Sequence, residues 1–284
     1  MSALKISLLD TGFFKLDGGA MFGVVPKSMW KKMNPPDDNN MCTWAMRCLL
    51  IESGDRKIVV DTGLGNKQDE KFRSHFYPHG DATLLGSLKA KGLTPSDITD
   101  VFQTHLHFDH VGGAVTKNKK GELVPTFPNA TYWSNQDHYN AAINPNPREK
   151  ASFLKENIVP LFDHKVLKFI PVEQGYEFIP GVKVYFMYGH TDAMMTLEIE
   201  SNGSTYYYCA DLLPSSFHIG IPYVMSYDLH PLKTMEEKTE LLAKAVDRNM
   251  RLIFEHDPVN AVGTVKRNER GRIVLDEVMG EINS

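Results

Sequence analysis

The sequence predicts an α/β (α+β) fold, and two patterns along its 284 residues support this class. In the first half, a helix over 82–91 ends before a glycine, a short capped helix starts at 94–97, and an apolar strand follows at 100–103. The second half is richer in strands, two of which are joined by an Asn-Gly hairpin turn at 202–203. No repeat, low-complexity tract or linker interrupts the chain, so we expect a single domain over 1–284.

The first 60 residues are expected to form strands and loops. A strand over 4–9 leads to a glycine-rich stretch at 17–23, which is either an apolar flap over a pocket or a β-turn that carries core residues. A polar, proline-containing loop over 30–40 precedes one apolar strand over 43–52, which a Ser-Gly-Asp turn joins to a partner strand over 56–60. Later elements of the first half are a hairpin over 111–128, a strand over 130–133, and helices over 135–143 and 151–161.

The second half is expected to contain a run of strands followed by one long connection and one helix. The connection over 212–233 is rich in aromatic residues and long for an ordinary loop, so we interpret it as a wall or lid of a pocket. A capping-box pattern at Thr234 predicts a helix whose apolar face continues to Met250, followed by a buried strand at 252–254 and a final hairpin. The strands expected before the connection cover 166–170, 176–179, 182–187, 196–200 and 205–209.

Potential metal ligands are concentrated directly after the apolar strand at 100–103. His105 and His107 are two apart on an extended segment, so they point the same way and can bind one ion. Asp109 and His110 lie on the following turn and can reach a second ion. Crowded imidazoles repel one another when they are protonated, so this spacing makes sense mainly around a cation.

Three further candidate ligands also follow strand-like runs. His190 comes after the strand at 182–187, Asp211 after the strand at 205–209, and His256 after the buried strand near the end of the chain. Side chains at successive strand ends meet at one rim of a sheet. Asp61 ends another strand and is either a carboxylate that orients a ligating histidine or a turn cap. The candidate metal ligands are therefore His105, His107, Asp109, His110, His190, Asp211 and His256.

Composition argues against several other classes of protein. There are 31 Lys and Arg against 35 Asp and Glu, a formal net charge of −4, so no basic surface for nucleic acid is expected. Cys42, Cys48 and Cys209 form no C-x-x-C pair, which fits a reducing compartment better than a disulfide framework. Neither a signal peptide nor a run approaching about 20 apolar residues is evident. We therefore expect a cytoplasmic protein with no membrane partner.

The ligand pattern resembles the metallo-β-lactamase fold superfamily. The resemblance is carried by the His-x-His-x-Asp-His stretch at 105–110, Gly-His-Thr at 189–191, the lone Asp211, the late His256 and the Asp-Thr-Gly turn at 61–63. It implies an αβ/βα four-layer sandwich with two mixed sheets, outer helices and two metals at the rim of the sheets. The resemblance implies that His105, His107 and His190 hold the first metal, that Asp109, His110 and His256 hold the second, and that Asp211 bridges them.

Within that superfamily, the chain is most similar to the acyl-homoserine lactonases of the YtnP-type branch. The stretches at 17–27, 104–113 and 210–214 carry this similarity, together with Tyr227-Asp228. One position departs from the better-known lactonases of the group, which place a tyrosine three residues after the bridging aspartate to polarise the lactone carbonyl. This chain has Pro214 there, and either Tyr223 or His218 is a candidate to replace the tyrosine.

These features lead to a mechanistic hypothesis. Two divalent cations, with zinc favoured and iron, cobalt or manganese also compatible with the ligands, would share a hydroxide that attacks the carbonyl of a lactone or ester. Asp109 would pass a proton to the leaving oxygen, and Tyr223 would contact the carbonyl. Met21, Phe22, His218 and Tyr223 are expected to line the substrate pocket.

N-acyl-homoserine lactones are the favoured substrates. A phosphotriester, a thioester or another ester remains the alternative, and a non-catalytic zinc-binding protein is a third hypothesis. The resemblance also implies that the chain can pair as a homodimer.

Overall fold

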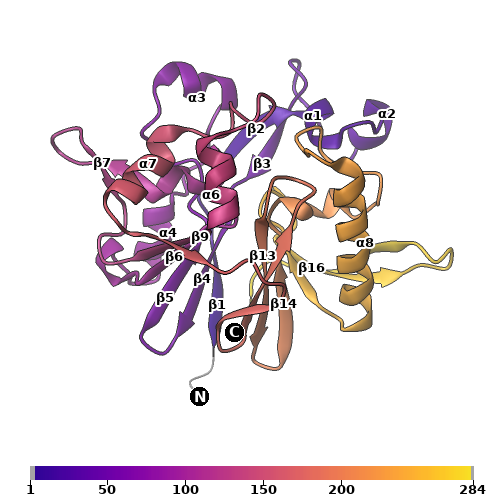
Figure 1. Ribbon diagram of the computed structural model, residues 1–284. Helices are drawn as coiled ribbons and strands as arrows, with labels where there is room; N and C mark the ends of the chain where they lie inside the picture. The colour runs from indigo at the N-terminus through magenta and orange to yellow at the C-terminus, as the bar shows by residue number, and fades with distance from the viewer. Residues whose placement is uncertain (1–3, 283–284) are drawn as a thin grey trace.

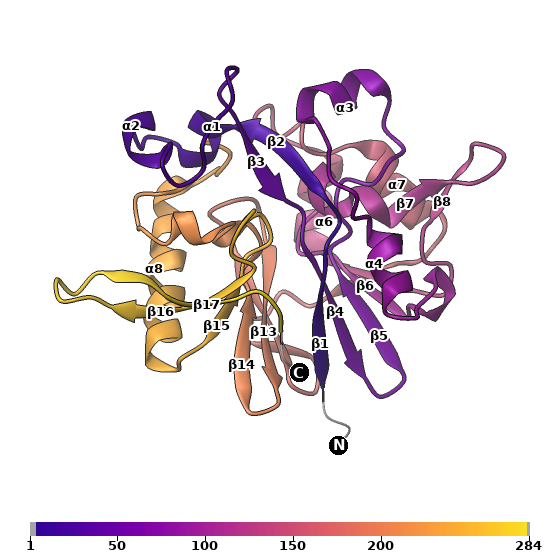
Figure 2. The same cartoon turned by 180° about the vertical axis from the view of Figure 1, so that it is seen from behind.

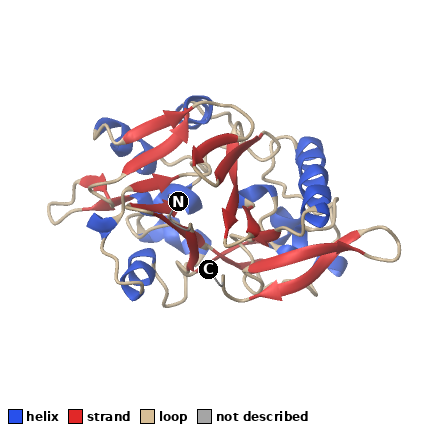
Figure 3. Ribbon diagram, turned by 90° about the horizontal axis from the view of Figure 1, so that it is seen from below, coloured by secondary structure: helices blue, strands red, loops and turns tan. Residues whose placement is uncertain are grey.

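The computed structural model describes residues 4–282, in which two large β-sheets face each other and helices cover their outer sides (Figure 1). A six-stranded sheet comes from the first half of the chain and a seven-stranded sheet from the second. The view from below separates these layers (Figure 3). The expected four-layer sandwich with two mixed sheets is therefore confirmed.

The two sheets differ in their strand directions. In the first sheet the β1–β4 and β4–β5 pairs are antiparallel and the other three pairs are parallel. In the second sheet the β14–β15 pair is parallel and its other pairs are antiparallel. The first sheet is ordered β1 (Lys5–Leu9), β4 (Cys48–Ser53), β5 (Arg56–Val60), β6 (Asp100–Phe102), β9 (Thr131–Asn135) and β10 (Leu167–Ile170). The second is ordered β11 (Tyr176–Ile179), β12 (Val182–Met187), β13 (Met194–Ser201), β14 (Ser204–Tyr208), β15 (Arg251–Ile253), β16 (Val262–Arg267) and β17 (Ile273–Met279).

Helices pack on the outer face of each sheet. Three of them, α4 (Leu84–Ala90), α6 (Gln136–Ile143) and α7 (Lys155–Asp163), share a buried apolar cluster with the first sheet. The long α8 (Pro231–Asp247) covers the second sheet, and the view from behind places it on the opposite side of the molecule from α4 and α7 (Figure 2). Another apolar cluster joins the inner faces of both sheets, so the two halves share one buried interior. Within residues 4–282, no helix combines the length and the apolar composition that crossing a bilayer requires.

Shorter elements lie around the rim of the two sheets. Two small ribbons pair β2 (Phe13–Asp17) with β3 (Met41–Ala45) and β7 (Val115–Lys117) with β8 (Leu123–Pro125). The short α-helices are α1 (Gly18–Phe22), α2 (Lys27–Trp30), α3 (Glu70–Phe76) and α5 (Phe108–Val111). Single 3-10 turns are η1 (Pro95–Asp97), η2 (Gly112–Ala114), η3 (Ala210–Leu212) and η4 (Ser216–His218).

The single strand expected over 43–52 is wrong. The chain leaves the small ribbon after Ala45 and enters the first sheet at Cys48, so β3 and β4 belong to different sheets. Main-chain hydrogen bonds from Ala45 N to His256 O and from Arg47 N to Glu255 O hold the crossing in place. These partners are about 200 positions away in the sequence, so local apolar content did not reveal the break.

Three further local expectations need correction. The stretch at 17–23 contains the helix α1, because an Asp17 carboxylate oxygen accepts from Ala20 N at its start. The helix expected from Thr234 begins at Pro231, where proline suits the first helical position, and Thr234 lies inside it. The helix α3, which starts after Asp69, was not expected from the sequence.

Candidate metal centre

The loop after β6 carries the first four candidate ligands into the space between the two sheets. His105 and His107 lie on this loop, and Asp109 and His110 lie on α5. Thr62 N donates to His110 O over 2.7 Å, so the turn after β5 holds α5 in place. Gly112 packs so closely here that a Cβ atom would lie 2.1 Å from Leu64 O, which only glycine permits.

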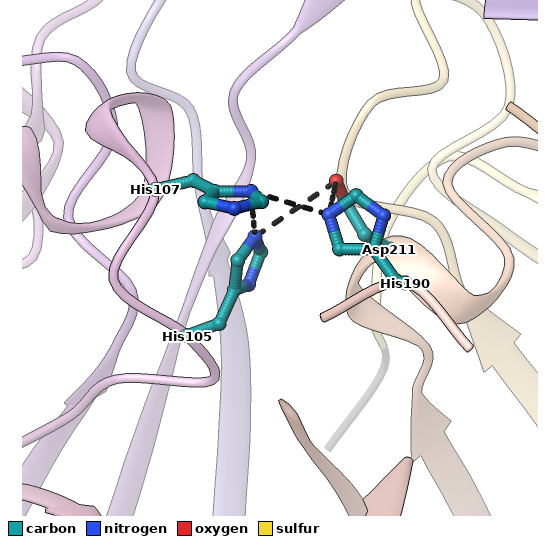
Figure 4. Close-up of side chains that lie close together, drawn as sticks. All are labelled: His105, His107, His190 and Asp211. Atoms are coloured by element: carbon teal, nitrogen blue, oxygen red, sulfur yellow. Dashed lines mark hydrogen bonds and ion pairs between the residues drawn. The ribbon is translucent and has the colours of Figure 1, made fainter. Parts of the chain in front are cut away.

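All seven candidate ligands are buried and lie close together in two groups. The groups come from both halves of the chain, as expected from the strand ends. Within each group, the potential ligand atoms lie within 4.8 Å of one another. The first ligand group is His105, His107, His190 and Asp211 (Figure 4). The second ligand group is Asp109, His110 and His256.

Asp211 lies between the two groups. Its Oδ2 is 3.2 Å from His190 Nε2 and 3.9 Å from His105 Nε2, both in the first group. Its Oδ1 is 3.0 Å from His256 Nε2 and 3.4 Å from His110 Nε2, both in the second group. One carboxylate therefore presents one oxygen to each group, which is the arrangement of a bridging ligand.

Each imidazole also faces an oxygen atom at the nitrogen that points away from the centre. The His190 Nδ1 lies 2.9 Å from an Asp228 oxygen, and the His256 Nδ1 lies 2.7 Å from Ala45 O. These acceptors place the ring protons on the outer nitrogens and leave lone pairs directed inward. The remaining outer contacts are His105 Nδ1 to Thr104 Oγ1 at 3.1 Å, His110 Nδ1 to Asp61 and Glu255 at 3.2 Å, and His107 Nε2 to Glu149 at 3.4 Å.

The inner nitrogens fit divalent cations. His107 Nδ1 lies 3.1 Å from His105 Nε2 and 3.2 Å from His190 Nε2, while His256 Nε2 lies 3.1 Å from His110 Nε2. With the protons on the outer nitrogens, these contacts set lone pair against lone pair, which is unfavourable unless a cation lies among them. The donor set of imidazole and carboxylate suits zinc and also iron, cobalt or manganese.

The pKa shifts of the histidines also favour bound cations. Burial lowers the pKa of His105 well below its ordinary value, helped by His110 and His107, so this ring is neutral and able to act as a ligand. Burial also lowers the pKa of His256, but the neighbouring Asp211 carboxylate outweighs it and raises the pKa to about 9. The site therefore favours positive charge at its centre, and bound divalent cations would supply it.

The sequence indicated one of the carboxylates that hold the histidines and missed three others. Asp61 accepts from Thr104 N at 2.8 Å and from Thr104 Oγ1 at 2.6 Å, and it also faces His110, so its position is compatible with orienting that ring. Glu149 and Asp228 have equivalent positions at His107 and His190, and Glu255 faces the same His110 ring as Asp61. Glu255 directly precedes His256 and Asp228 lies in the long connection, so both could have been weighed as candidates, whereas nothing near Glu149 marked it.

A cavity of about 330 Å³ opens beside the ligands. Its floor includes His107, Asp109, His190, Asp211 and His256. Its walls are mainly apolar, with a few polar groups on the loops at the mouth. The wall residues are Leu16, Met21, Phe76, Phe108, Arg148, Glu149, Ala151, Ser152, Met225, Ser226 and Tyr227.

Of the four residues expected in the substrate pocket, only Met21 lines this cavity. Phe22 is fully buried in the aromatic core beside the cavity, stacked on His218 at a centroid distance of 5.0 Å. His218 is also buried, with its ring nitrogens bound to Ser215 and to Met21 O. Tyr223 meets the edge of Phe22 and does not line the cavity. The tyrosine that lines the cavity is Tyr227, because the connection folds back along α1 and turns residues 225–227 toward the ligands.

The two facing sheets, with two adjacent groups of His and Asp side chains at their rim, define an α/β protein with a candidate dinuclear metal centre. The sequence profile of the metallo-beta-lactamase superfamily matches residues 47–256, which contain all seven candidate ligands. The chain therefore belongs to the metallo-beta-lactamase superfamily, and it is a hydrolase of that superfamily.

Individual relatives agree with this assignment. An N-acyl homoserine lactonase of Bacillus cereus is 24% identical over 258 residues, covering 86% of this chain and 90% of the relative. A probable metal-dependent hydrolase from Staphylococcus aureus is 30% identical, with a TM-score of 0.85 over 98% of this chain and 100% of its own. AidC, a dizinc quorum-quenching lactonase in complex with the product N-hexanoyl-L-homoserine, is 23% identical, with a TM-score of 0.75 over 99% of this chain and 97% of its own, and shows the shared fold.

Proposed function

We propose that this hydrolase opens lactones or related carboxylic esters, with N-acyl-homoserine lactones as the favoured substrates. The observation that carries the proposal is the cavity, whose floor of imidazoles and carboxylates adjoins a largely apolar wall. An ester carbonyl placed on the floor would leave an acyl chain against Leu16, Met21 and Met225. The lactonase name of the Bacillus cereus relative supports a lactone as the first substrate to test.

The two ligand groups would hold two divalent cations, with Asp211 between them. Cations in such a site supply a strongly acidified water and withdraw electron density from a carbonyl oxygen. The chain itself would position the ester, because His107, Asp109 and His256 form the cavity floor and a largely apolar wall lies beside them.

Asp109 is the proposed proton carrier. Its side chain lies at the floor of the cavity and keeps a small exposed area. Its Oδ2 is 3.8 Å from both His110 Nε2 and His256 Nε2, so one oxygen faces the second ligand group. The other oxygen is available to move a proton to the alcohol oxygen that leaves when the lactone opens.

Tyr227 replaces Tyr223 as the proposed tyrosine contact of the substrate carbonyl. It lines the same cavity as Asp109 and Asp211, and the residue is 38% exposed. Burial of its hydroxyl raises the pKa of Tyr227, helped by Asp109, so the phenol keeps its proton and can donate a hydrogen bond. We expect Tyr227→Phe to lower kcat/KM about 10-fold or more, while Tyr223→Phe leaves it nearly unchanged.

The proposed activity is tested on the purified, cation-loaded protein. A pH-indicator assay would follow acid release from lactones of varied acyl length, with a linear ester, a thioester and a phosphotriester as comparisons. Lactones should be hydrolysed with the highest kcat/KM, and the rate should disappear after chelation and return with added zinc. Faster turnover of the phosphotriester or thioester would overturn the lactone assignment, and tight cation binding without any turnover would favour the non-catalytic hypothesis.

A further inference from the structure

The loop between α6 and α7 brings a buried carboxylate against one of the ligands. Glu149 is 4% exposed, and its Oε1 lies 3.4 Å from His107 Nε2. Both atoms are buried, and neither has a hydrogen-bond partner among the described residues. The opposite nitrogen of the same ring, Nδ1, faces His105 and His190 inside the first ligand group. Glu149 therefore approaches His107 from the side that a cation would not occupy.

The loop is built to hold Glu149 in this position. Asn146 Oδ1 accepts from the main-chain nitrogens of Arg148 and Glu149 at 2.9 and 3.1 Å, and its Nδ2 donates to Glu149 Oε2 at 2.6 Å. Further along, Ser152 O accepts from Phe108 N at 2.9 Å, which ties the loop to the segment that carries His107. A carboxylate with one oxygen fixed in this way directs the other at the imidazole.

The same loop makes a second contact with the His107 ring. Phe153 lies against it at a centroid distance of 4.8 Å. One loop thus limits both the position of the ring and the hydrogen bond that its outer nitrogen can make. Without an outer acceptor, the His107 ring can place its proton on Nδ1 instead, and that tautomer directs no lone pair at the first ligand group.

We propose that Glu149 is a positioning residue for the first ligand group: it accepts the Nε2 proton of His107 and so keeps the Nδ1 lone pair directed at the bound cation. The inference rests on the proposed cation-dependent function but is tested by cation binding, which needs no substrate. It assigns a role to a residue outside the seven ligands, on an element that contributes none of them.

The test compares cation binding by three forms of the full chain. Metal-free wild type, Glu149→Gln and Glu149→Ala are titrated with Zn²⁺ in competition with a chromophoric chelator. We expect Glu149→Ala to bind the cation of the first ligand group about 10- to 100-fold more weakly. Glu149→Gln should lose less, because its amide oxygen can still accept from Nε2. Binding at the second ligand group should change far less, since its outer acceptors are elsewhere in the chain.

A control variant separates this role from a general effect of charge. Glu156 is an exposed glutamate at the start of α7, so Glu156→Gln makes the same change in net charge without touching a ligand. Its cation affinities should match the wild type. Asn146→Ala, which frees the far oxygen of Glu149, should weaken the first cation in the same direction by a smaller factor.

A spectroscopic measurement adds a readout that loss of packing alone would not move. With Co²⁺ in place of zinc, the visible absorption bands should shift in Glu149→Ala, recover partly in Glu149→Gln, and stay unchanged in Glu156→Gln. Wild-type affinity and an unshifted Co²⁺ spectrum in Glu149→Ala would overturn the proposal. If that variant does not fold, the same two readings on Glu149→Gln and Asn146→Ala decide it. Failure to hydrolyse any lactone would instead refute the proposed substrate and leave this result intact.

Discussion

The two ligand groups are held by different parts of the molecule. Outer partners of the first group include Glu149 and Asp228, which lie on long surface connections. Outer partners of the second group are Asp61, Glu255 and Ala45 O, all in the buried region where β3, β5 and β15 end. The first group is thus supported by loops, and the second by the sheet ends themselves.

This difference predicts which substitutions should change both the cation affinity and the stability of the fold. Glu255 is fully buried, and this burial raises the pKa of its carboxyl group to about 7. Glu255 is therefore part of the buried interior as well as a neighbour of the ligands. Changes behind the second group should therefore affect both unfolding and cation affinity. Changes behind the first group should affect affinity while leaving the metal-free fold close to normal.

Asp211 belongs to both groups, so its loss should have the largest effect. In Asp211→Ala the carboxylate that faces His190 on one side and His256 on the other is absent. We expect the protein to lose tight binding of both cations and more than about 100-fold in kcat/KM, beyond the usual effect of removing only an outer partner. Elemental analysis and lactone hydrolysis measure the two losses. Retention of two cations with full activity would refute the bridging role.

Asp61 tests the coupling expected of the second group. It is fully buried, has a φ of 56° that asparagine tolerates, and accepts two hydrogen bonds from Thr104 besides facing His110. Asp61→Asn should therefore lower the free energy of unfolding of the metal-free protein by about 2–3 kcal/mol. It should also weaken the cation of the second group. Urea unfolding with and without chelator would show both, and an unchanged metal-free stability would contradict the comparison.

The contrast between sheet ends and loops also explains which site residues could be predicted from the sequence. All seven candidate ligands could be singled out because each follows an apolar strand-like run, and parallel or neighbouring strand ends share one rim. Asp61 was recognisable for the same reason. Glu149 was not, because its approach to His107 depends on how a loop between two helices folds back over the site. The chain gives no local signal for that path.

The long connection shows a second limit. Its role as a wall of the cavity was predicted, but Tyr223 and His218, the residues expected there, do not line the cavity, whereas Tyr227 does. A buried lysine decides this, since Lys238 Nζ donates to the carbonyl oxygens of His218, Gly220 and Tyr223 at 2.8–3.0 Å and anchors that part of the connection to α8. The part of the connection that turns toward the cavity is therefore residues 225–227, after Tyr223.

Asp228 tests the loop-supported group. Its Oδ1 faces His190 Nδ1 at 2.9 Å, while its Oδ2 accepts from Met225 N at 3.2 Å within the same connection. Asp228→Asn should weaken the cation of the first group about 10- to 100-fold. The unfolding free energy of the metal-free protein should change much less than in Asp61→Asn. If Asp228→Asn and Asp61→Asn destabilised the metal-free protein equally, both ligand groups would be coupled to folding to the same degree. The proposed difference between a loop-supported and a sheet-supported group would then be wrong.

The smallest effect is expected at Asp100, which lies in the first sheet away from both groups and isolates the acid sensitivity of the fold. Burial alone would raise its pKa, but hydrogen bonds from Arg56, Thr99 and Trp133 outweigh it and lower the pKa below the ordinary value. The unfolded chain therefore binds this proton at higher pH than the native protein does. The stability that Asp100 contributes is present above about pH 4 and is lost as the pH falls through its lower native pKa.

In metal-free protein, Asp100→Asn should cost about 1–2 kcal/mol at neutral pH, a modest value because Arg56 is 37% exposed. The fall in stability on acidification should then be shallower than in the wild type. Urea unfolding at a series of pH values, with chelator present throughout, measures both quantities. Asp100→Asn could instead leave the pH dependence of the unfolding free energy unchanged while Asp61→Asn makes it shallower. The carboxylates behind the second ligand group would then dominate acid unfolding, and the coupling of that group to the fold would include its pH dependence.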